Sequence, residues 1–265
     1  MGGGRLAPLP HRLRSRCRGG GERGPPAGIV AARSRHVAGR RSMLADSGSE
    51  FTLAEEFFLI AHDDHTGRGL LDADVLAVGL AGAVLAGLVL AGRVTVLDGK
   101  VALMDERPAG DPIGDPLIAA LRQEGEQRTV RAWIDELRDG LTATVAEDLE
   151  ARGVIRPVVA RQPVHRRPRV RYPAVDPVRA VRPRVRLGHA LGRAVRVDAR
   201  TALLAAIVRA TGLAGWFIDV YGPPVRGQLA RISANLPPSL RTLITAVERA
   251  SRPRWSFAVH RQIAV

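Results

Sequence analysis

A run of about 18 uncharged residues, Val75 to Gly92, constrains the fold of this chain more than any other feature. Its length is close to the ~20 residues with which a helix crosses a bilayer. The run is rich in alanine and glycine, and Gly79, Ala83 and Gly87 recur every four residues as a strip of small side chains. Such a strip lets another helix approach closely. We therefore predict a central helix buried in a soluble domain, with close packing along this strip.

The residues that follow predict a β-hairpin. In "RVTVLDGKVALMD" apolar and polar residues alternate on both sides of Asp98-Gly99. An Asp-Gly pair between alternating segments is the strongest short-range hairpin signal. The buried helix is thus expected to lead directly into two antiparallel strands.

Several other segments show the spacing of amphipathic helices. Leu53, Phe57 and Phe58 recur at helical spacing, and Thr52 with Glu55 has the spacing of a capping box. Residues 128–155 are interpreted as two helices, and residues 201–217 and 224–250 as amphipathic helices, the latter interrupted by Pro237-Pro238. The sequence predicts a mainly α fold: a single helical domain with a central buried hydrophobic helix, surrounding amphipathic helices and one or two β-hairpins.

The domain is expected to occupy residues 49–250, with a basic Pro/Arg segment at 156–196 and a tail at 251–265 that we do not assign. Residues 1–48 form an Arg/Gly-rich arm, since residues 1–42 hold about ten arginines and one acid, Glu22. Such a composition predicts disorder. Three interpretations of the arm remain: a disordered basic arm that touches anionic surfaces, an inert tail, or a segment that precedes a translation start at Met43.

The charge of the chain directs attention to acidic partners. The formal net charge is +14 and the pI is about 11.5, which suits nucleic acid or an anionic membrane surface. Lys100 is the only lysine, and this arginine bias fits a high-GC bacterial source. The lone Cys17 excludes an internal disulfide framework and fits a reducing cytoplasm.

The sequence "HDDH", residues 62–65, raises the question of a metal site. His62 and His65 are spaced i, i+3, so both would share one face of a continuous helix. Gly67 and Gly69 end the helix directly afterwards, and no third ligand lies nearby in the sequence. We therefore interpret the stretch as a solvated helix end and predict that it binds no metal.

Patterns of catalysis are absent from the sequence. It has no G-x-S-x-G elbow, no phosphate-binding loop of the G-x-x-x-x-G-K-S/T type and no cysteine pair. The aspartates of "GDPIGD", residues 110–115, are interpreted as turn residues rather than cation ligands. The sequence thus predicts a protein that is not an enzyme and needs no cofactor.

The basic segment is the second informative feature, with about a dozen arginines between Arg161 and Arg200. Two triplets alternate with Pro and Val, and an extended chain would project each triplet to one side. Three interpretations stay open: contact with an anionic membrane, contact with nucleic acid, and a solvated linker. Tyr172 is the only aromatic residue there, which disfavours base stacking. The triplets are Arg167, Arg169 and Arg171, and Arg182, Arg184 and Arg186.

The order of the motifs resembles the Golgi phosphoprotein 3-like family, which has bacterial members. The motifs are "LAEEFFLIAHDDHTG", "LVLAGRV", a hairpin, "PAGDPIGDPLI", "TVRAWIDEL" and "LEARGVI", over residues 51–155. Residues 197–217 resemble the later long helix of the family more loosely. The resemblance implies a non-enzymatic helical domain, whose eukaryotic members bind phosphatidylinositol 4-phosphate on cytoplasmic membrane faces and connect other proteins to a vesicle coat.

The lipid pocket of the family, a tryptophan and three arginines, does not carry over. The tryptophan falls at Asp72, one arginine at Ala81, and the other two at Asp139 and Thr142. Arg138 is adjacent to one of these positions. The apolar membrane hairpin of the family falls on "RPVVARQPVHRRPRVRYP", residues 156–173, which is basic and broken by proline.

We therefore expect a bacterial, cytoplasmic, peripheral membrane protein that binds anionic phospholipid and serves other proteins as an adaptor. The alternative is nucleic-acid binding through the arginine segment. Sequence alone does not identify the oligomeric state. The candidate lipid-binding residues are Arg138, Arg166, Arg167, Arg169 and Arg171.

Overall fold

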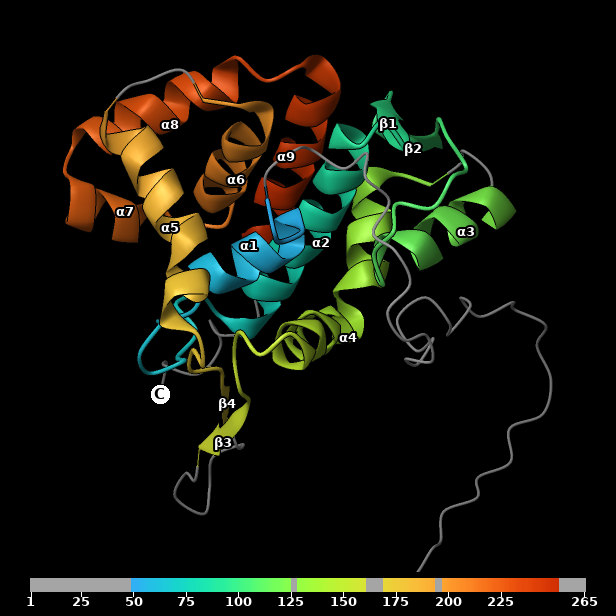
Figure 1. Cartoon of the computed structure of the whole chain (residues 1–265). Helices are drawn as coiled ribbons and strands as arrows, with labels where there is room; N and C mark the ends of the chain where they lie inside the picture. Colours follow the sequence, from blue (N-terminus) through green and yellow to red (C-terminus); the bar gives the residue numbers. More distant parts are fainter. Residues whose placement is uncertain (1–48, 125–127, 161–168, 194–196, 253–265) are drawn as a thin grey trace, which may run out of the picture.

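The structure is a computed structural model, and it describes residues 49–124, 128–160, 169–193 and 197–252 (Figure 1). The predictions about the arm at 1–48, and those about Arg166 and Arg167, fall outside these ranges. So does the tail from residue 253 onward.

The fold is mainly helical, as the sequence predicted. The described part of the chain forms nine helices and two separate antiparallel hairpins. The helices are α1 (Leu53–Ile60), α2 (Ala73–Leu90), α3 (Gly114–Glu124), α4 (Val130–Ala151), α5 (Pro177–Gly192), α6 (Ala199–Ala210), α7 (Ala214–Tyr221), α8 (Pro224–Ala234) and α9 (Pro238–Ser251). The strands are β1 (Val94–Leu97), β2 (Lys100–Leu103), β3 (Val158–Ala160) and β4 (Arg169–Arg171).

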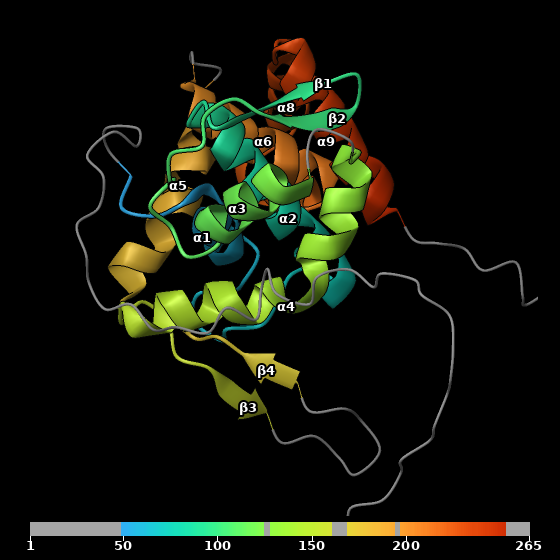
Figure 2. The same cartoon turned by 90° about the vertical axis from the view of Figure 1, so that its right-hand side faces the viewer.

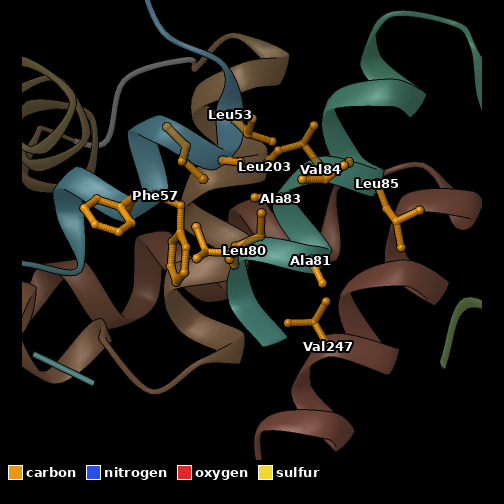
Figure 3. Packing of buried hydrophobic residues seen from close by; sticks show 14 of the residues in the cluster. Leu53, Phe57, Leu80, Ala81, Ala83, Val84, Leu85, Leu203 and Val247 are labelled. Carbon is orange, nitrogen blue, oxygen red and sulfur yellow. The ribbon is translucent and has the colours of Figure 1, made fainter. Parts of the chain in front are cut away.

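Helix α2 is the buried central helix. It packs against α1, α4, α6 and α9, which surround it (Figures 1 and 2). In Figure 3, Phe57 of α1, Leu203 of α6 and Val247 of α9 gather around Leu80 and its neighbours. Of the helices described, α2 alone is long and apolar enough to cross a membrane unaided, and 61 % of it is buried by its neighbours. Most of its apolar surface is therefore covered by the neighbouring helices.

Close packing occurs at Gly79, as predicted, but at Gly82 rather than at Gly87. A Cβ atom built on Gly79 would lie 2.4 Å from the ring of Phe57, and one on Gly82 would lie 2.4 Å from Val247. At Gly87 the nearest atom is the Cβ of Leu53 at 3.8 Å, an ordinary contact. The prediction of a tight approach at Gly87 is wrong, because this end of the helix borders a cavity of about 340 Å³.

Local signals in the sequence placed several boundaries correctly. Thr52 and Glu55 form the predicted capping box on α1. Asp98 and Gly99 both have positive φ, 50° and 75°, as a two-residue hairpin turn requires. Residues 128–155 are two helical halves joined by a kink at Asp139 and Gly140, so the prediction of two helices is confirmed.

Two predictions of local structure are wrong. Residues 201–217 are not one helix, because α6 ends before Gly212, whose φ is +80°, and α7 leaves at 107°. Arg182, Arg184 and Arg186 do not lie on an extended chain, because residues 177–192 form α5. Asp176 starts that helix by accepting a hydrogen bond from the amide of Arg179, and Pro177 occupies its first turn.

Candidate functional site

The β3–β4 hairpin projects away from the helical body (Figures 1 and 2). Val159 pairs with Val170, so the side chains of Val159 and Val170 share one face of the hairpin. Val158 pairs with Arg171. The side chains of Val158, Val159 and Val170 are 42 %, 64 % and 45 % exposed. The basic, proline-broken segment therefore contains an exposed hairpin with apolar side chains, the second of the one or two hairpins that the sequence predicted.

The hairpin also carries uncompensated positive charge. Arg156 before β3 and Arg171 in β4 are exposed, and neither forms an ion pair with a residue that the structure describes. Arg169 lies in β4, at the Cα position paired with Ala160. Of the five predicted lipid-binding residues, the structure thus places Arg169 and Arg171 on this hairpin.

Arg138 belongs to a different place in the fold. It lies at the kink of α4, where its guanidinium is 3.9 Å from the carboxylates of both Asp135 and Asp139. Two neighbouring acids therefore offset its charge, which makes it a weaker anion ligand than the arginines of the hairpin.

The four positions of the family's lipid pocket hold no cationic cluster. Asp72 precedes α2 and is exposed, and Asp139 is exposed at the kink of α4. Ala81 is fully buried and points toward Val247 of α9 (Figure 3). Two of the four positions thus carry negative charge, and a third belongs to the core.

Most arginines of α5 are structural, so the interpretation of this segment as a solvated linker is wrong there. Arg179 donates to Glu50 at 2.7 Å, and Arg186 donates to Glu56 at 2.8 Å. Arg184 is buried, donates to Asp64 at 2.6 Å and also donates to three carbonyl groups at the end of α1. These ion pairs connect α5 to α1 and to the residues beside it, and they offset the positive charge of the three guanidinium groups.

The two acids of α1 are the other half of this network, which was not predicted from the sequence. Glu56 is fully buried and accepts hydrogen bonds from Ser49 at 2.5 Å and Arg200 at 3.0 Å as well as from Arg186. Glu55 pairs with Arg152, the residue that follows α4. Burial raises the pKa of Glu55 to about 7, and its hydrogen bond with Asp148 acts in the same direction.

His62 is buried, so its interpretation as part of a solvated helix end is wrong. Its Nδ1 lies 2.8 Å from the carbonyl of Phe58, and its ring packs on Phe58 and on Tyr172. Burial lowers the pKa of His62 to about 4, which keeps the imidazole neutral at pH 7. His65 is exposed on the following turn, so the two histidines do not converge.

We predict that protein purified without added metal contains no stoichiometric zinc or manganese. Within the described ranges no group of three or more His, Cys, Asp or Glu side chains is arranged to hold a metal ion. Elemental analysis of the wild-type chain and of a His62→Ala/His65→Ala variant tests this. Bound metal that disappears in the variant would contradict it.

The "GDPIGD" turn is held together by its own aspartates. Asp111 accepts from the amides of Ile113 and Gly114, which caps α3, and Asp115 accepts from the amides of Ala109 and Gly110. Both carboxylates are occupied by backbone N–H groups, so their role as turn residues follows from the contacts.

These features define a class of protein: a helical domain around a buried apolar helix, with a projecting hairpin that is both apolar and basic. The chain belongs to the Golgi phosphoprotein 3 (GPP34) family, whose sequence profile matches residues 53–247. A search of curated proteins found no match.

Proposed function

We propose that this protein is a non-enzymatic peripheral membrane protein that binds anionic phospholipid through the β3–β4 hairpin. The observation that carries the proposal is the exposure of Val158, Val159 and Val170 on the same projecting element as Arg156 and Arg171. Family membership supports it. By the same reasoning it acts on the cytoplasmic side of a membrane and serves as an adaptor for client proteins.

The two kinds of side chain contribute in different ways. Valines that leave water for the interface contribute by the area they bury, at about 25 cal/mol per Å². Arginines within a Debye length of an anionic surface add about 1 kcal/mol each. A short hairpin offers few valines and few arginines. Its affinity for an anionic membrane should therefore be modest and should depend strongly on salt.

The described residues of the hairpin offer no basis for recognition of one head group. The pocket positions are Asp72, Ala81, Asp139 and Thr142, and none is a cation. We therefore expect binding to follow the total negative charge of the lipid rather than its identity, with no strong preference for phosphatidylinositol 4-phosphate.

We predict that changing Arg166, Arg167, Arg169 and Arg171 together to Ser removes most binding to anionic vesicles. Loss of four positive charges, at about 1 kcal/mol each, should weaken binding by several powers of ten at low salt. Val159→Ser/Val170→Ser should weaken it further at all salt concentrations, because burial of apolar surface is not screened. Co-sedimentation with vesicles of phosphatidylcholine and phosphatidylserine measures both effects.

A matched control uses arginines elsewhere on the surface. Arg226 and Arg231 of α8 are exposed and form no ion pair with the residues that the structure describes, so Arg226→Ser/Arg231→Ser should leave vesicle binding nearly unchanged. A tenfold rise in binding when phosphatidylinositol 4-phosphate replaces other lipid at equal charge, about 1.4 kcal/mol, would contradict diffuse binding. Arg138 would then be the first residue to test.

Binding to nucleic acid is the second candidate function. It is favoured by the arginines of 161–171, but Tyr172 packs against Phe58 and His62 and so is engaged within the fold. Saturable binding of single-stranded DNA that the four-arginine variant abolishes, without binding to vesicles, would favour this candidate.

A further inference from the structure

A second basic surface lies far from the β3–β4 hairpin, in a groove between α4 and α9. The groove has a volume of about 630 Å³, within the range of small-ligand sites. Its walls are the turn of the β1–β2 hairpin at Gly99, the first residues of α4, and one face of α9. Every polar side chain that lines it is an arginine or a threonine: Arg131, Arg241, Arg249, Thr129, Thr242 and Thr245.

The charge in this groove is largely unneutralised. Arg241 and Arg249 are exposed and form no ion pair within the described part of the chain. Arg131 donates to Asp135 at 2.7 Å, which leaves further N–H groups of its guanidinium. Glu248, the acid beside Arg249, already pairs with Arg209 and Arg252. No acidic side chain lines the groove itself.

The spacing of the cations suits a ligand with more than one anionic group. Arg241 and Arg249 are eight residues apart on α9, which is on the order of 12 Å along a helix axis. Arg131 lies on the opposite wall, where the N-terminus of α4 adds a partial positive charge. Guanidinium groups bind phosphate through paired N–H donors, so three of them can engage separate phosphates of one molecule.

We propose that this groove binds a soluble ligand that carries two or more phosphate groups. A lipid head group is the other source of such phosphates. The β1–β2 hairpin and the start of α4 lie at the opposite end of the molecule from the β3–β4 hairpin (Figures 1 and 2). A flat membrane that meets the β3–β4 hairpin would therefore not reach the groove, which favours the soluble source.

Titration calorimetry of the full chain with sodium tripolyphosphate at about 0.15 M salt, where the Debye length is about 8 Å, tests the proposal. We expect saturable binding that Arg241→Ser/Arg249→Ser weakens at least about tenfold, equivalent to about 1.4 kcal/mol. The control Arg226→Ser/Arg231→Ser removes the same charge from α8 and should change the affinity less than about twofold, because exposed charges beyond a Debye length are screened. Orthophosphate should bind more weakly than tripolyphosphate, because it engages fewer of the arginines.

Three results would overturn the proposal. Equal losses in both double variants would mean diffuse attraction to net charge rather than a site. A loss of vesicle binding in Arg241→Ser/Arg249→Ser would assign the groove to a lipid head group. Tighter, Arg241- and Arg249-dependent binding of single-stranded DNA would assign it to nucleic acid. The vesicle test of the β3–β4 hairpin uses different residues, so either proposal can fail without the other.

Discussion

Replacing Arg184 by methionine is expected to destabilise the fold by about 3–5 kcal/mol, the cost of removing one partner from a buried charged network. The side chain of Arg184 is 7 % exposed, and its guanidinium donates to Asp64 and to the carbonyls of Leu59, Ile60 and His62. Those carbonyls are at the end of α1, where the helix supplies no partner of its own. Methionine preserves most of the apolar stem and leaves Asp64 and the carbonyls unpaired.

Denaturant unfolding followed by circular dichroism measures the effect. Arg182→Met on the same helix is the matched control, because Arg182 is exposed and its loss should change stability by less than about 0.5 kcal/mol. Arg184→Lys keeps the charge but not the planar fork, so its cost should fall between the two. Adding Asp64→Asn to Arg184→Met should recover part of the loss. Stability of Arg184→Met within about 1 kcal/mol of wild type would show that the network contributes little.

The sequence predicted the elements whose signals are local. The uncharged run became α2, the Asp98-Gly99 pair became a hairpin turn, and Thr52 capped α1. Each signal rests on residues within a few positions of one another, where backbone geometry and helix periodicity decide the outcome. These local rules predicted the mainly helical class and its central buried helix.

Long-range pairing could not be predicted in the same way. Glu56 meets Arg186 and Arg200, which are 130 and 144 residues further along the chain, and nothing in a charge pattern identifies such partners. The alternation of Arg and Pro around Arg184 suggested an extended chain. The Asp176-Pro177 pair, a helix-start signal, would have corrected it.

The candidate site was predicted in part. Arg169 and Arg171 do lie on a projecting hairpin, and the sequence predicted one or two hairpins without placing the second one here. Pro157 directly precedes β3, a position that strands tolerate because no ladder hydrogen bond is lost inside the strand. The groove between α4 and α9 was not predicted, because its arginines come from helices that meet only in the folded chain.

Replacing Gly79 by alanine is expected to destabilise the fold by about 1–3 kcal/mol, although alanine gains about 1 kcal/mol over glycine in helix propensity. The added Cβ would lie 2.4 Å from the Phe57 ring and 2.9 Å from the methyl carbon of Thr211, so α1 or the end of α6 must move away from α2. Phe57 is fully buried and cannot swing into solvent. The same substitution at Gly82 meets Val247 of α9 at 2.4 Å and should be similarly harmful.

Replacing Gly87 by alanine should have the opposite effect on the stability of the fold. Its new Cβ would have only the Cβ of Leu53 within 4 Å, at 3.8 Å, so the propensity gain of alanine should appear as up to about 1 kcal/mol of added stability. Denaturant midpoints of Gly79→Ala and Gly87→Ala should thus fall on either side of wild type. Equal changes of the denaturant midpoint at both positions would mean that α2 is not tightly packed around Gly79. Recovery of the wild-type chain in the membrane fraction after carbonate extraction would show that α2 spans a bilayer instead.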